Sequence, residues 1–240
     1  MKKTLYLLFA AAILTGCSNS NNGLHLKVTG KQAIWGNGTI EFRTDMDSKG
    51  KRDDNPAFEA YVKYEDGKTI HMPIDGYSTG YGASFPMGNH GFYMPFQGLA
   101  KAEVLSRSDE KLVMHLHYDP WTIFGEPITL DKQVTVYRDS PVMSVIDYYE
   151  GMFELLNIAA GLTTAFTGTV NEIEDGFAIE YPYGITAVIV MPQAQERDTD
   201  DLLGYAVLKK GVSSGEPLRY YVGISDKGAD YIIEEIAKIL

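Results

Sequence analysis

The chain contains almost no cysteine. Cys17 is the only one among 240 residues, so the rest of the chain can form no disulfide, no cysteine-based zinc site and no cysteine nucleophile. An exported domain of this length can be stable without disulfides, because it buries a large apolar core. The lack of thiols therefore limits the chemistry of the protein and not its ability to fold.

Basic residues are scarce as well. The sequence has 21 Lys and Arg residues against 32 Asp and Glu residues. Removal of an N-terminal segment that contains Lys2 and Lys3 leaves 19 basic residues against 32 acidic ones, a net charge of −13. Nucleic acids and anionic membrane surfaces bind to cationic patches. Neither is therefore an expected partner of the folded part.

Common catalytic signatures and long apolar segments are missing too. The sequence has no Gly-x-Ser-x-Gly elbow, no His-Glu-x-x-His pair, no Walker loop and no Rossmann glycine pattern, which argues against several large enzyme classes. The apolar run Leu5–Leu14 is too short for a membrane-spanning helix. No cofactor and no metal ion is predicted from these patterns.

The first seventeen residues are typical of an exported protein. Lys2 and Lys3 precede the run Leu5–Leu14, and small residues follow it, which is the order of a cleavable secretory signal. Leu14-Thr15-Gly16-Cys17 resembles a bacterial lipobox, in which the thiol receives fatty acyl chains such as palmitate. The sequence predicts a lipoprotein signal peptide over residues 1–16, lipidation of Cys17 and a tether over residues 17–23. The alternative is an ordinary signal peptide with a chance cysteine.

The residues after the cysteine predict where the lipid anchor is held. Ser18 stands where lipoproteins retained in the inner membrane carry an aspartate. The acidic cluster of some surface-exposed lipoproteins is absent from residues 18–23. By this resemblance, we expect an envelope protein anchored in the outer membrane, with its domain facing the periplasm.

From residue 24 onward, short alternating segments and turn residues predict an all-β fold. Asn37-Gly38 between Ala33–Trp35 and Thr39–Arg43 is a hairpin signal. Strands at short spacing predict a single β-sandwich domain over residues 24–240. Further predicted strands are Phe58–Tyr64, Thr69–Met72, Lys111–Tyr118, Lys132–Tyr137, Val142–Tyr149, Phe177–Tyr181, Thr186–Met191, Tyr205–Leu208 and Arg219–Ile224.

One helix is predicted, at the C-terminus. Ser225 or Asp226 can cap it. Its apolar residues recur at helical spacing, which predicts a stripe that packs against the sandwich. These residues are Tyr231, Ile232, Ile236, Ile239 and Leu240.

The segment Lys111–Tyr118 carries two histidines on one side of a predicted strand. Successive side chains of a strand point to opposite faces, so Leu112, Met114, Leu116 and Tyr118 are expected in the core. His115 and His117 then share the other face, where two imidazoles can serve as a general acid and base or ligate a metal. The alternative is that both histidines form ordinary hydrogen bonds on a solvated face.

A segment rich in glycine and aromatic residues, Gly76–Gly82 followed by Asn89–Tyr93, is predicted to be a loop. Exposed rings of Tyr77 and Tyr81 beside His90 would suit the apolar C–H faces and the hydroxyls of a sugar. The alternative is an aromatic plug that closes one end of the sandwich.

Four acidic residues lie in or beside predicted strands: Asp119, Asp147, Glu180 and Asp226. Any two could be the carboxylate pair of a glycosidase, because that chemistry needs two such groups at a defined separation. The sequence alone does not supply the separation.

From about Lys101 onward, the chain resembles an exported bacterial family classed as domain of unknown function 4861. The resemblance rests on His117-Tyr118-Asp119-Pro120-Trp121, Ile128–Tyr149, Tyr183–Pro192 and Tyr220–Gly228 with the terminal helix. Ser225 departs from the family pattern, which has tryptophan there, and the first hundred residues are shorter than in the family. The resemblance implies a β-supersandwich like that of galactose mutarotases and an association with polysaccharide utilisation, without an established activity.

Two functional hypotheses follow. The first is an anchored domain that binds or processes a mono- or oligosaccharide, as a hydrolase or epimerase if it is an enzyme. The second is a non-catalytic envelope lipoprotein that acts as a protein-binding scaffold. For the first, the predicted ligand-binding residues are Tyr77, Tyr81 and Trp121, and the predicted catalytic residues are His90, His115, His117, Asp119 and Glu180.

Overall fold

Three sheets of antiparallel strands make up the folded part of the chain. The structure is a computed structural model that describes residues 23–47, 56–64, 67–72, 74, 78–88, 91–95, 98–165 and 167–240. One five-stranded sheet has the order β1-β2-β3-β4-β5, the central eight-stranded sheet β13-β14-β15-β18-β11-β10-β9-β8, and the other five-stranded sheet β16-β17-β12-β6-β7. The predicted all-β sandwich with a C-terminal helix is confirmed.

The described strands and helix have the following bounds. They are β1 (His25–Val28), β2 (Gln32–Gly36), β3 (Ile40–Asp45), β4 (Glu59–Lys63), β5 (Thr69–Met72), β6 (Tyr81–Gly88), β7 (Gly91–Phe92), β8 (Lys101–Arg107), β9 (Lys111–Ile123), β10 (Glu126–Tyr137), β11 (Val142–Gly151), β12 (Leu156–Thr163), β13 (Thr169–Ile173), β14 (Gly176–Tyr181), β15 (Ile185–Val190), β16 (Glu196–Asp200), β17 (Tyr205–Val212), β18 (Pro217–Ser225) and α1 (Ala229–Ala237).

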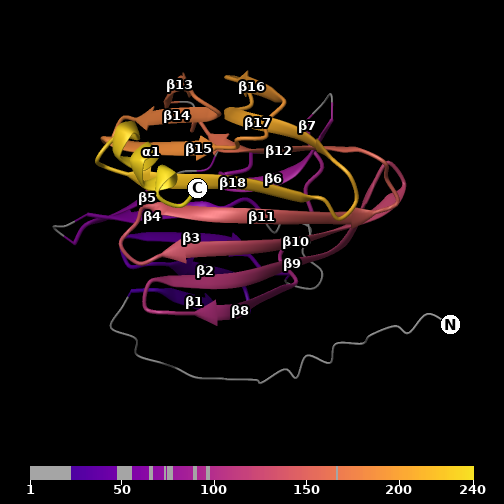
Figure 1. Cartoon of the computed structure of the whole chain (residues 1–240), viewed down its shortest axis with the longest axis horizontal. Coiled ribbons are helices and arrows are strands. Elements are labelled where there is room, and N and C mark those ends of the chain that lie inside the picture. Colours follow the sequence, from indigo (N-terminus) through magenta and orange to yellow (C-terminus); the bar gives the residue numbers. More distant parts are fainter. Residues whose placement is uncertain are drawn as a thin grey trace.

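The two smaller sheets share the inner face of the eight-stranded sheet. Sheet β1–β5 lies behind β8–β11 in the lower half of Figure 1, and the sheet containing β6, β12 and β17 lies behind β14, β15 and β18 in the upper half. One apolar core cluster draws residues from all three sheets, from Trp35 and Phe85 to Ile189. Both halves of the sandwich are therefore joined by a common core.

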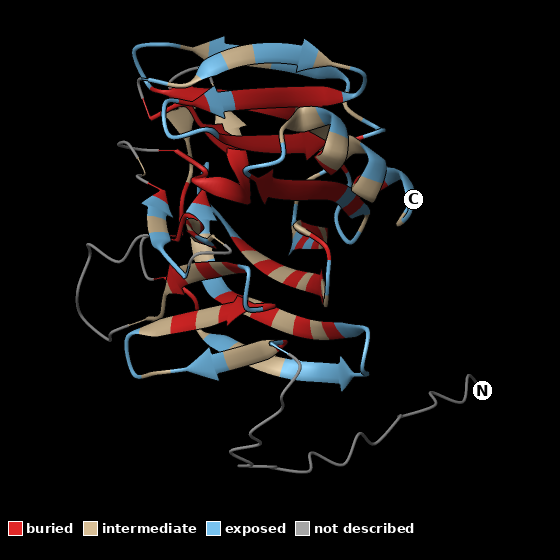
Figure 2. Ribbon diagram, turned by 90° about the vertical axis from the view of Figure 1, so that its left-hand side faces the viewer, coloured by how far each residue is buried: buried red, intermediate tan, exposed pale blue. Residues whose placement is uncertain are grey.

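Among the described residues, the outer face of the eight-stranded sheet is covered at one end only. In Figure 2, strands of the lower half show alternating bands of buried and partly exposed residues, whereas the strands beside the helix are buried almost continuously. In β9 the predicted inward residues Leu112, Met114, Leu116 and Tyr118 are fully buried. The residues that alternate with them along β9, such as His115 and His117, therefore point to the opposite, uncovered face of the sheet.

Helix α1 covers the other half of this outer face. Ile232 and Ile236 are buried against Val142, Val188 and Tyr221. The helix begins later than the sequence predicts: its N-cap is Gly228, at φ 85° and without a side-chain cap bond. Neither predicted cap, Ser225 or Asp226, holds that position, because β18 continues through Ser225.

The glycine-rich segment Gly76–Gly82, predicted to be a loop, runs into a strand at its end, since Tyr81 and Gly82 begin β6. Residues Tyr81–Gly88 form β6, which pairs with β12 inside the second five-stranded sheet. A Cβ atom on Gly82, at φ 96°, would lie 2.5 Å from Cγ2 of Val222. Glycine is thus used here for close packing and not for a solvent-exposed loop. Within the described ranges, no helix has the length and apolar character needed to cross a membrane.

Candidate functional site

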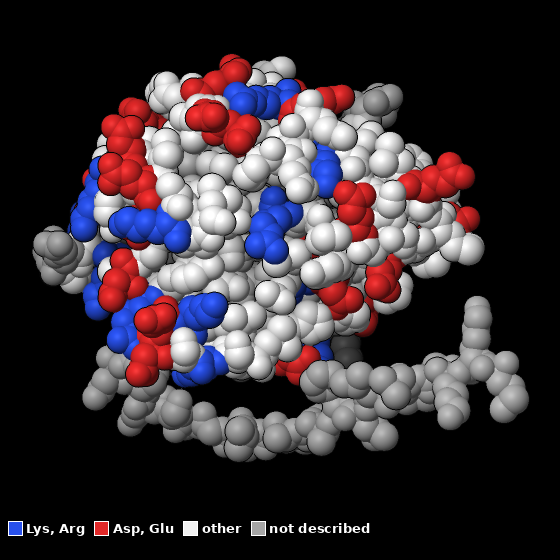
Figure 3. Space-filling model, in the orientation of Figure 1, with Lys and Arg blue, Asp and Glu red and all other residues white. Residues whose placement is uncertain are grey.

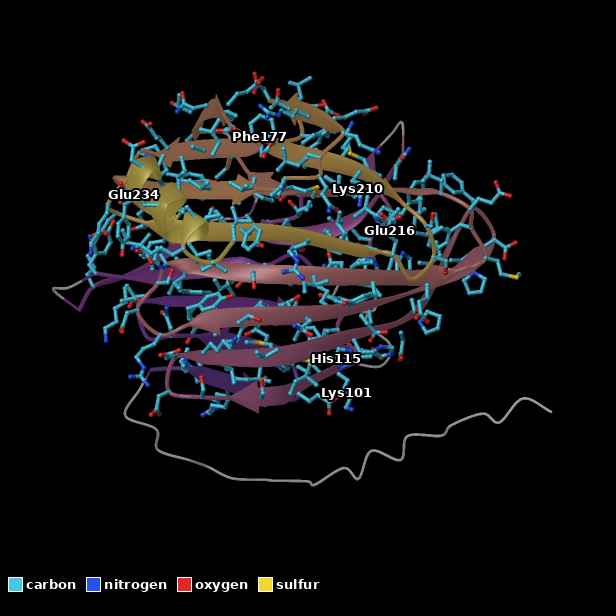
Figure 4. The ribbon with its side chains drawn as sticks, viewed as in Figure 1. Lys101, His115, Phe177, Lys210, Glu216 and Glu234 are labelled. Atoms are coloured by element: carbon cyan, nitrogen blue, oxygen red, sulfur yellow. The ribbon has the colours of Figure 1, made fainter. Side chains whose placement is uncertain are left out.

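The uncovered outer face carries a cluster of ionisable side chains, which we call the histidine face: Glu103, His115, His117, Asp119 and Asp131. The register of the strands brings them together, since His117 pairs with Asp131 of β10 and His115 pairs with Glu103 of β8. Figure 4 shows His115 and Lys101 on neighbouring strands at the lower edge of the sheet. Three strands thus contribute to one polar patch.

Asp131 lies at the centre of the histidine face. Its Oδ1 atom is 2.7 Å from Nε2 of His115 and 2.7 Å from Nδ1 of His117. The outer imidazole nitrogens face further carboxylates: Nδ1 of His115 is 3.3 Å from Oε1 of Glu103, and Nε2 of His117 is 3.6 Å from Oδ1 of Asp119. Each imidazole therefore lies between two carboxylates.

The cluster is open to solvent and carries more carboxylates than fixed cations. The side chains of His115, His117 and Asp131 are 26%, 31% and 35% exposed. Nζ of Lys101 is 2.8 Å from Oε2 of Glu103. This hydrogen bond is the main cause that lowers the pKa of Glu103, partial burial opposes it, and His115 adds to the lowering. Such a cluster can bind a cation, accept hydroxyl hydrogen bonds or exchange protons.

A second candidate region, the end cleft, lies where the β9–β10 hairpin and the β11–β12 connection meet β6. It is a hollow of about 570 Å³. Phe124 is 78% exposed beside it, with its ring 4.9 Å from that of Tyr93 at an angle of 63°. The lining residues are Pro86, Met87, Gly88, Tyr93, Ile123, Phe124, Glu126, Ile128, Met152, Phe153, Leu155, Leu156 and Asn157.

Trp121 lies near the end cleft, next to the lining residue Tyr93. Its Nε1 donates a hydrogen bond to the carbonyl oxygen of Tyr93 at 3.1 Å. The register between β9 and β10 shifts between Ile128 and Leu130, next to Trp121. Because such a bulge reverses the alternation of side chains, Trp121 packs against the core instead of sharing the face of His115 and His117.

A third polar cluster is sealed inside the sandwich. Nζ of Lys132 is 2.8 Å from Oδ2 of Asp147 and 2.9 Å from Oγ of Ser84, and all three side chains are fully buried. The hydroxyl of Tyr220 donates to Asp147 at 3.1 Å. Burial lowers the pKa of Lys132 and the charge of Asp147 opposes this, while burial and Asp147 raise the pKa of Tyr149. This cluster has no solvent-exposed member and is structural.

The structure brings together three of the predicted catalytic residues, His115, His117 and Asp119. Glu180 lies apart on β14, with four strands of the sheet between β14 and β9, a separation of about 24 Å. Its Oε1 accepts a hydrogen bond from Nδ2 of Asn171 at 3.3 Å. Glu180 therefore does not act on the same ligand atoms as the histidines.

Tyr81 is a correction to the predicted ligand-binding set. It is fully buried, and its ring lies 6.0 Å from that of Tyr181, so it packs in the core because β6 is an inner strand. Tyr77, His90 and Cys17 lie outside the described residues.

Two residues of the histidine face, Glu103 and Asp131, were not predicted from the sequence, and Asp131 is the central one. The sequence feature that could have located Asp131 is a hairpin turn at Phe124-Gly125. In the structure both turn residues have positive φ, 52° and 90°. A turn there makes β9 and β10 antiparallel neighbours and places Asp131 near Tyr118 and His117. The register shift between β9 and β10 determines that Asp131 pairs with His117 and not with Tyr118. This shift is not visible in the sequence.

Comparison with known proteins identifies the N-terminal segment and the fold. Residues 1–18 match the prokaryotic membrane lipoprotein lipid attachment site, which includes Cys17. The chain is therefore a lipid-anchored lipoprotein of the cell envelope. The family classed as domain of unknown function 4861 does not match, so that resemblance stays a prediction. A search of curated proteins finds no match.

Two solved structures of carbohydrate-active proteins share the fold. A candidate kojibiose phosphorylase from the human microbiome aligns with 91% of this chain at a TM-score of 0.53 and 9% identity. A heparan sulfate lyase from Pedobacter heparinus aligns with 85% of this chain at a TM-score of 0.51 and 12% identity. The aligned parts are 36% and 37% of those longer chains, so this chain resembles one β-domain of each.

Proposed function

We propose that this lipoprotein binds carbohydrate in the end cleft and serves polysaccharide utilisation at the outer membrane. The observation that carries the proposal is the ring of Phe124, which projects beside a hollow of about 570 Å³ while 78% exposed. Binding sites for small molecules are concave, mostly apolar and furnished with a few polar groups. Glu126 and Asn157 supply such groups in the lining.

The backbone at Phe124 supports a functional role for this ring. Its φ of 52° is unusual for a bulky side chain and costs about 1–2 kcal/mol. An apolar aromatic ring in solvent gains no burial that offsets this cost. A sugar whose C–H face stacks on the ring would supply that burial. The nearby ring of Tyr93 offers a second surface at an angle to the first.

Binding, rather than hydrolysis, is the activity that the cleft supports. Among its described lining residues, Glu126 is the one carboxylate, whereas most glycosidases use two. The fold agrees with this proposal, since its solved neighbours include proteins named as a sugar phosphorylase and a heparan sulfate lyase. This chain corresponds to about a third of each, which is consistent with an accessory binding domain.

The described chain begins, at Gly23, far from the end cleft. Gly23 lies against the backbone of Asn37, whose Nδ2 donates to the carbonyl oxygen of Tyr137 at 2.7 Å. Tyr137 pairs with Lys111 at the start of β9, and Phe124 follows its end, so about 40 Å of strand separates them. The residues between Cys17 and Gly23 span at most about 20 Å. The cleft would then face away from the membrane.

The test is binding of the full-length lipoprotein, in mild detergent, to a panel of neutral plant and host oligosaccharides by calorimetry. We expect saturable binding to at least one glycan, weakened about three- to tenfold in Phe124→Ser, because an aromatic contact contributes about 0.5–1.5 kcal/mol. Tyr183→Ser is the matched control, since Tyr183 is an exposed aromatic residue of another turn. A flat response over the panel, or an equal loss in both variants, would overturn the proposal.

A second candidate function, protein binding, is favoured by the apolar patch around the cleft. Met152 is 78% and Leu155 65% exposed, and exposed methionine and leucine side chains are common on protein-binding surfaces. Figure 3 shows acidic side chains at this end of the molecule. Glu150 and Glu154, which are exposed, flank Met152 in the sequence. Such an acidic rim suits a partner segment whose apolar side chains are flanked by Lys and Arg.

Two synthetic amphipathic peptides test this alternative, one built from Leu and Lys and the other from Leu and Glu. Protein binding predicts that only the Leu-Lys peptide binds and that Met152→Ser with Leu155→Ser weakens it. Leu202→Ser is the control, because Leu202 is 90% exposed elsewhere. Equal binding of both peptides, or no effect of the double substitution, would contradict it.

A further inference from the structure

The three central side chains of the histidine face are arranged as metal ligands. One nitrogen or oxygen atom from each of His115, His117 and Asp131 lies within 4.8 Å of the others. We infer that these residues bind one divalent transition-metal ion of the zinc class. The sequence alone shows only the two histidines, and Asp131 from the neighbouring strand completes the set.

The distances fit such an ion after small side-chain rotations. Zinc bonds to imidazole nitrogen and carboxylate oxygen are about 2.0–2.2 Å long, so two ligands of one tetrahedral ion lie about 3.3 Å apart. The contacts of Asp131 Oδ1 with the two imidazoles are 2.7 Å each. These two distances would each lengthen by roughly 0.6 Å, and the two imidazole nitrogens, which lie within 4.8 Å of each other, would have to come to about 3.3 Å.

The outer nitrogens of both imidazoles support the assignment. Metal-bound histidines usually direct their second nitrogen to a carboxylate or carbonyl, which fixes the ring and its tautomer. Here Glu103 lies 3.3 Å from Nδ1 of His115, and Asp119 lies 3.6 Å from Nε2 of His117. Both rings thus have a carboxylate on the side away from Asp131, at hydrogen-bond distance for His115 and at ion-pair distance for His117. A pair of histidines on an ordinary polar face does not require this symmetry.

The ligand types select the class of ion. Two imidazoles and one carboxylate suit zinc, copper, nickel or iron, whereas calcium and magnesium prefer oxygen ligands alone. Glu103, Asp119 and Asp131 also bring three carboxylates to the cluster. The ammonium group of Lys101, which contacts Glu103, balances one of these charges. A divalent cation would offset this excess of negative charge.

Three protein ligands would leave a coordination position open. Zinc sites with three protein ligands keep a fourth position for water or substrate, unlike closed structural sites. The partial exposure of His115 and His117 leaves room for a ligand from solvent. This inference stands apart from carbohydrate binding, because the end cleft shares none of these residues.

The direct test is calorimetric titration of the full-length, chelator-treated lipoprotein with Zn²⁺ in mild detergent. We expect one ion per chain, saturation at micromolar concentration and a higher Tm with Zn²⁺, because an ion that binds the folded state stabilises it. Co²⁺ in place of Zn²⁺ should give the visible absorption bands of nitrogen and oxygen ligation. No saturable binding, or binding without a Co²⁺ spectrum, would overturn the inference.

Substitutions separate this site from adventitious surface binding. His115→Ala, His117→Ala and Asp131→Asn should each abolish stoichiometric binding, and Glu103→Gln should weaken it by about tenfold. His71→Ala is the matched control, because His71 lies on β5, 52% exposed and 3.8 Å from Glu59. Phe124→Ser should leave Zn²⁺ affinity unchanged. Retained affinity in the His115 and His117 variants, or equal loss in His71→Ala, would contradict the assignment.

Discussion

Asp131 and Lys132 are adjacent in β10, yet they belong to opposite faces of the sheet and to different environments. The Asp131 side chain is 35% exposed and shares its Oδ1 between His115 and His117. Lys132 is fully buried, 2.8 Å from Asp147. Each face of the sheet carries contacts between acidic and basic side chains, so residue type alone does not distinguish the two faces. The difference lies in access to water.

Access to water changes what an ionic pair contributes. A charge that is removed from water loses several kcal/mol of solvation, which its partners must replace. Inside the sandwich, Lys132 and Asp147 are fixed by Ser84 and Tyr220. On the histidine face, water still solvates the groups, so partners can be exchanged at little cost. The inner pair is thus suited to hold the fold, and the outer cluster to meet a ligand.

The largest expected effect comes from breaking the inner pair. Lys132→Met removes the ammonium and leaves the carboxylate of Asp147 buried without its cation. We expect the free energy of unfolding to fall by about 3–5 kcal/mol. Urea denaturation followed by circular dichroism measures this loss.

The double variant Lys132→Met with Asp147→Leu is the control for this prediction. It removes both charges together, so most of the lost stability should return, since apolar replacements of a buried ion pair are often neutral. If Lys132→Met alone unfolds no more readily than the parent protein, the view that this pair holds the fold is wrong.

The alternation of strand residues makes this contrast partly predictable. In β9 the sequence correctly separates inward Leu112 and Leu116 from outward His115 and His117. The same rule places Lys132 between the inward residues Leu130 and Val134, which is a visible exception to the apolar pattern. What the sequence does not show is the set of partners, because Asp147 lies opposite Lys132 only in the observed register of β10 and β11, and Tyr220 comes from the distant strand β18.

Local composition misled the sequence reading where tertiary packing decides the structure. The glycines of Gly76–Gly82 suggest a loop, yet Gly82 lies in β6 and permits close contact with Val222. The predicted caps Ser225 and Asp226 precede the observed helix start, because Ser225 continues β18 and the N-cap is Gly228. Asp131 was missed since its register depends on a bulge. The presence of strands therefore follows from the alternation of apolar and polar residues, whereas the composition of the histidine face depends on the register between strands.

The second prediction concerns the covered half of the outer face. A Cβ atom on Gly223 would lie 2.2 Å from Cγ2 of Ile232 in α1, so Gly223→Ala forces the helix or its side chain to move. Overpacking of this kind costs about 1–3 kcal/mol. Thermal unfolding checks it, and an unchanged Tm would show that α1 is held loosely. Gly30→Ala is the control, because nothing lies near the added atom.

A smaller effect is expected from the uncovered half. His115→Ala with His117→Ala, measured without added metal, should change the free energy of unfolding by less than about 1 kcal/mol, because partly exposed ionic contacts contribute little. Urea denaturation beside Lys132→Met makes the comparison direct. A loss as large as that of Lys132→Met would mean that the histidine face holds the fold as the inner pair does.

The smallest effect is a pKa change at the edge of the histidine face. The hydrogen bond from Lys101 is the main cause that lowers the pKa of Glu103, so Lys101→Met should raise it toward the ordinary value. A lowered pKa in the folded state stabilises the protein above the ordinary pKa of glutamate, and this stabilisation is lost as pH falls through the lowered one. Titration by NMR of the Glu103 carboxyl measures the shift. Because the Glu103 side chain is 42% exposed, water screens its contact and the stabilisation is small. Since pH 7 and pH 5 both lie above the ordinary pKa of glutamate, this carboxyl should contribute no difference in Tm between them. If the pKa of Glu103 is unchanged in Lys101→Met, then His115 and not Lys101 is the group that lowers it.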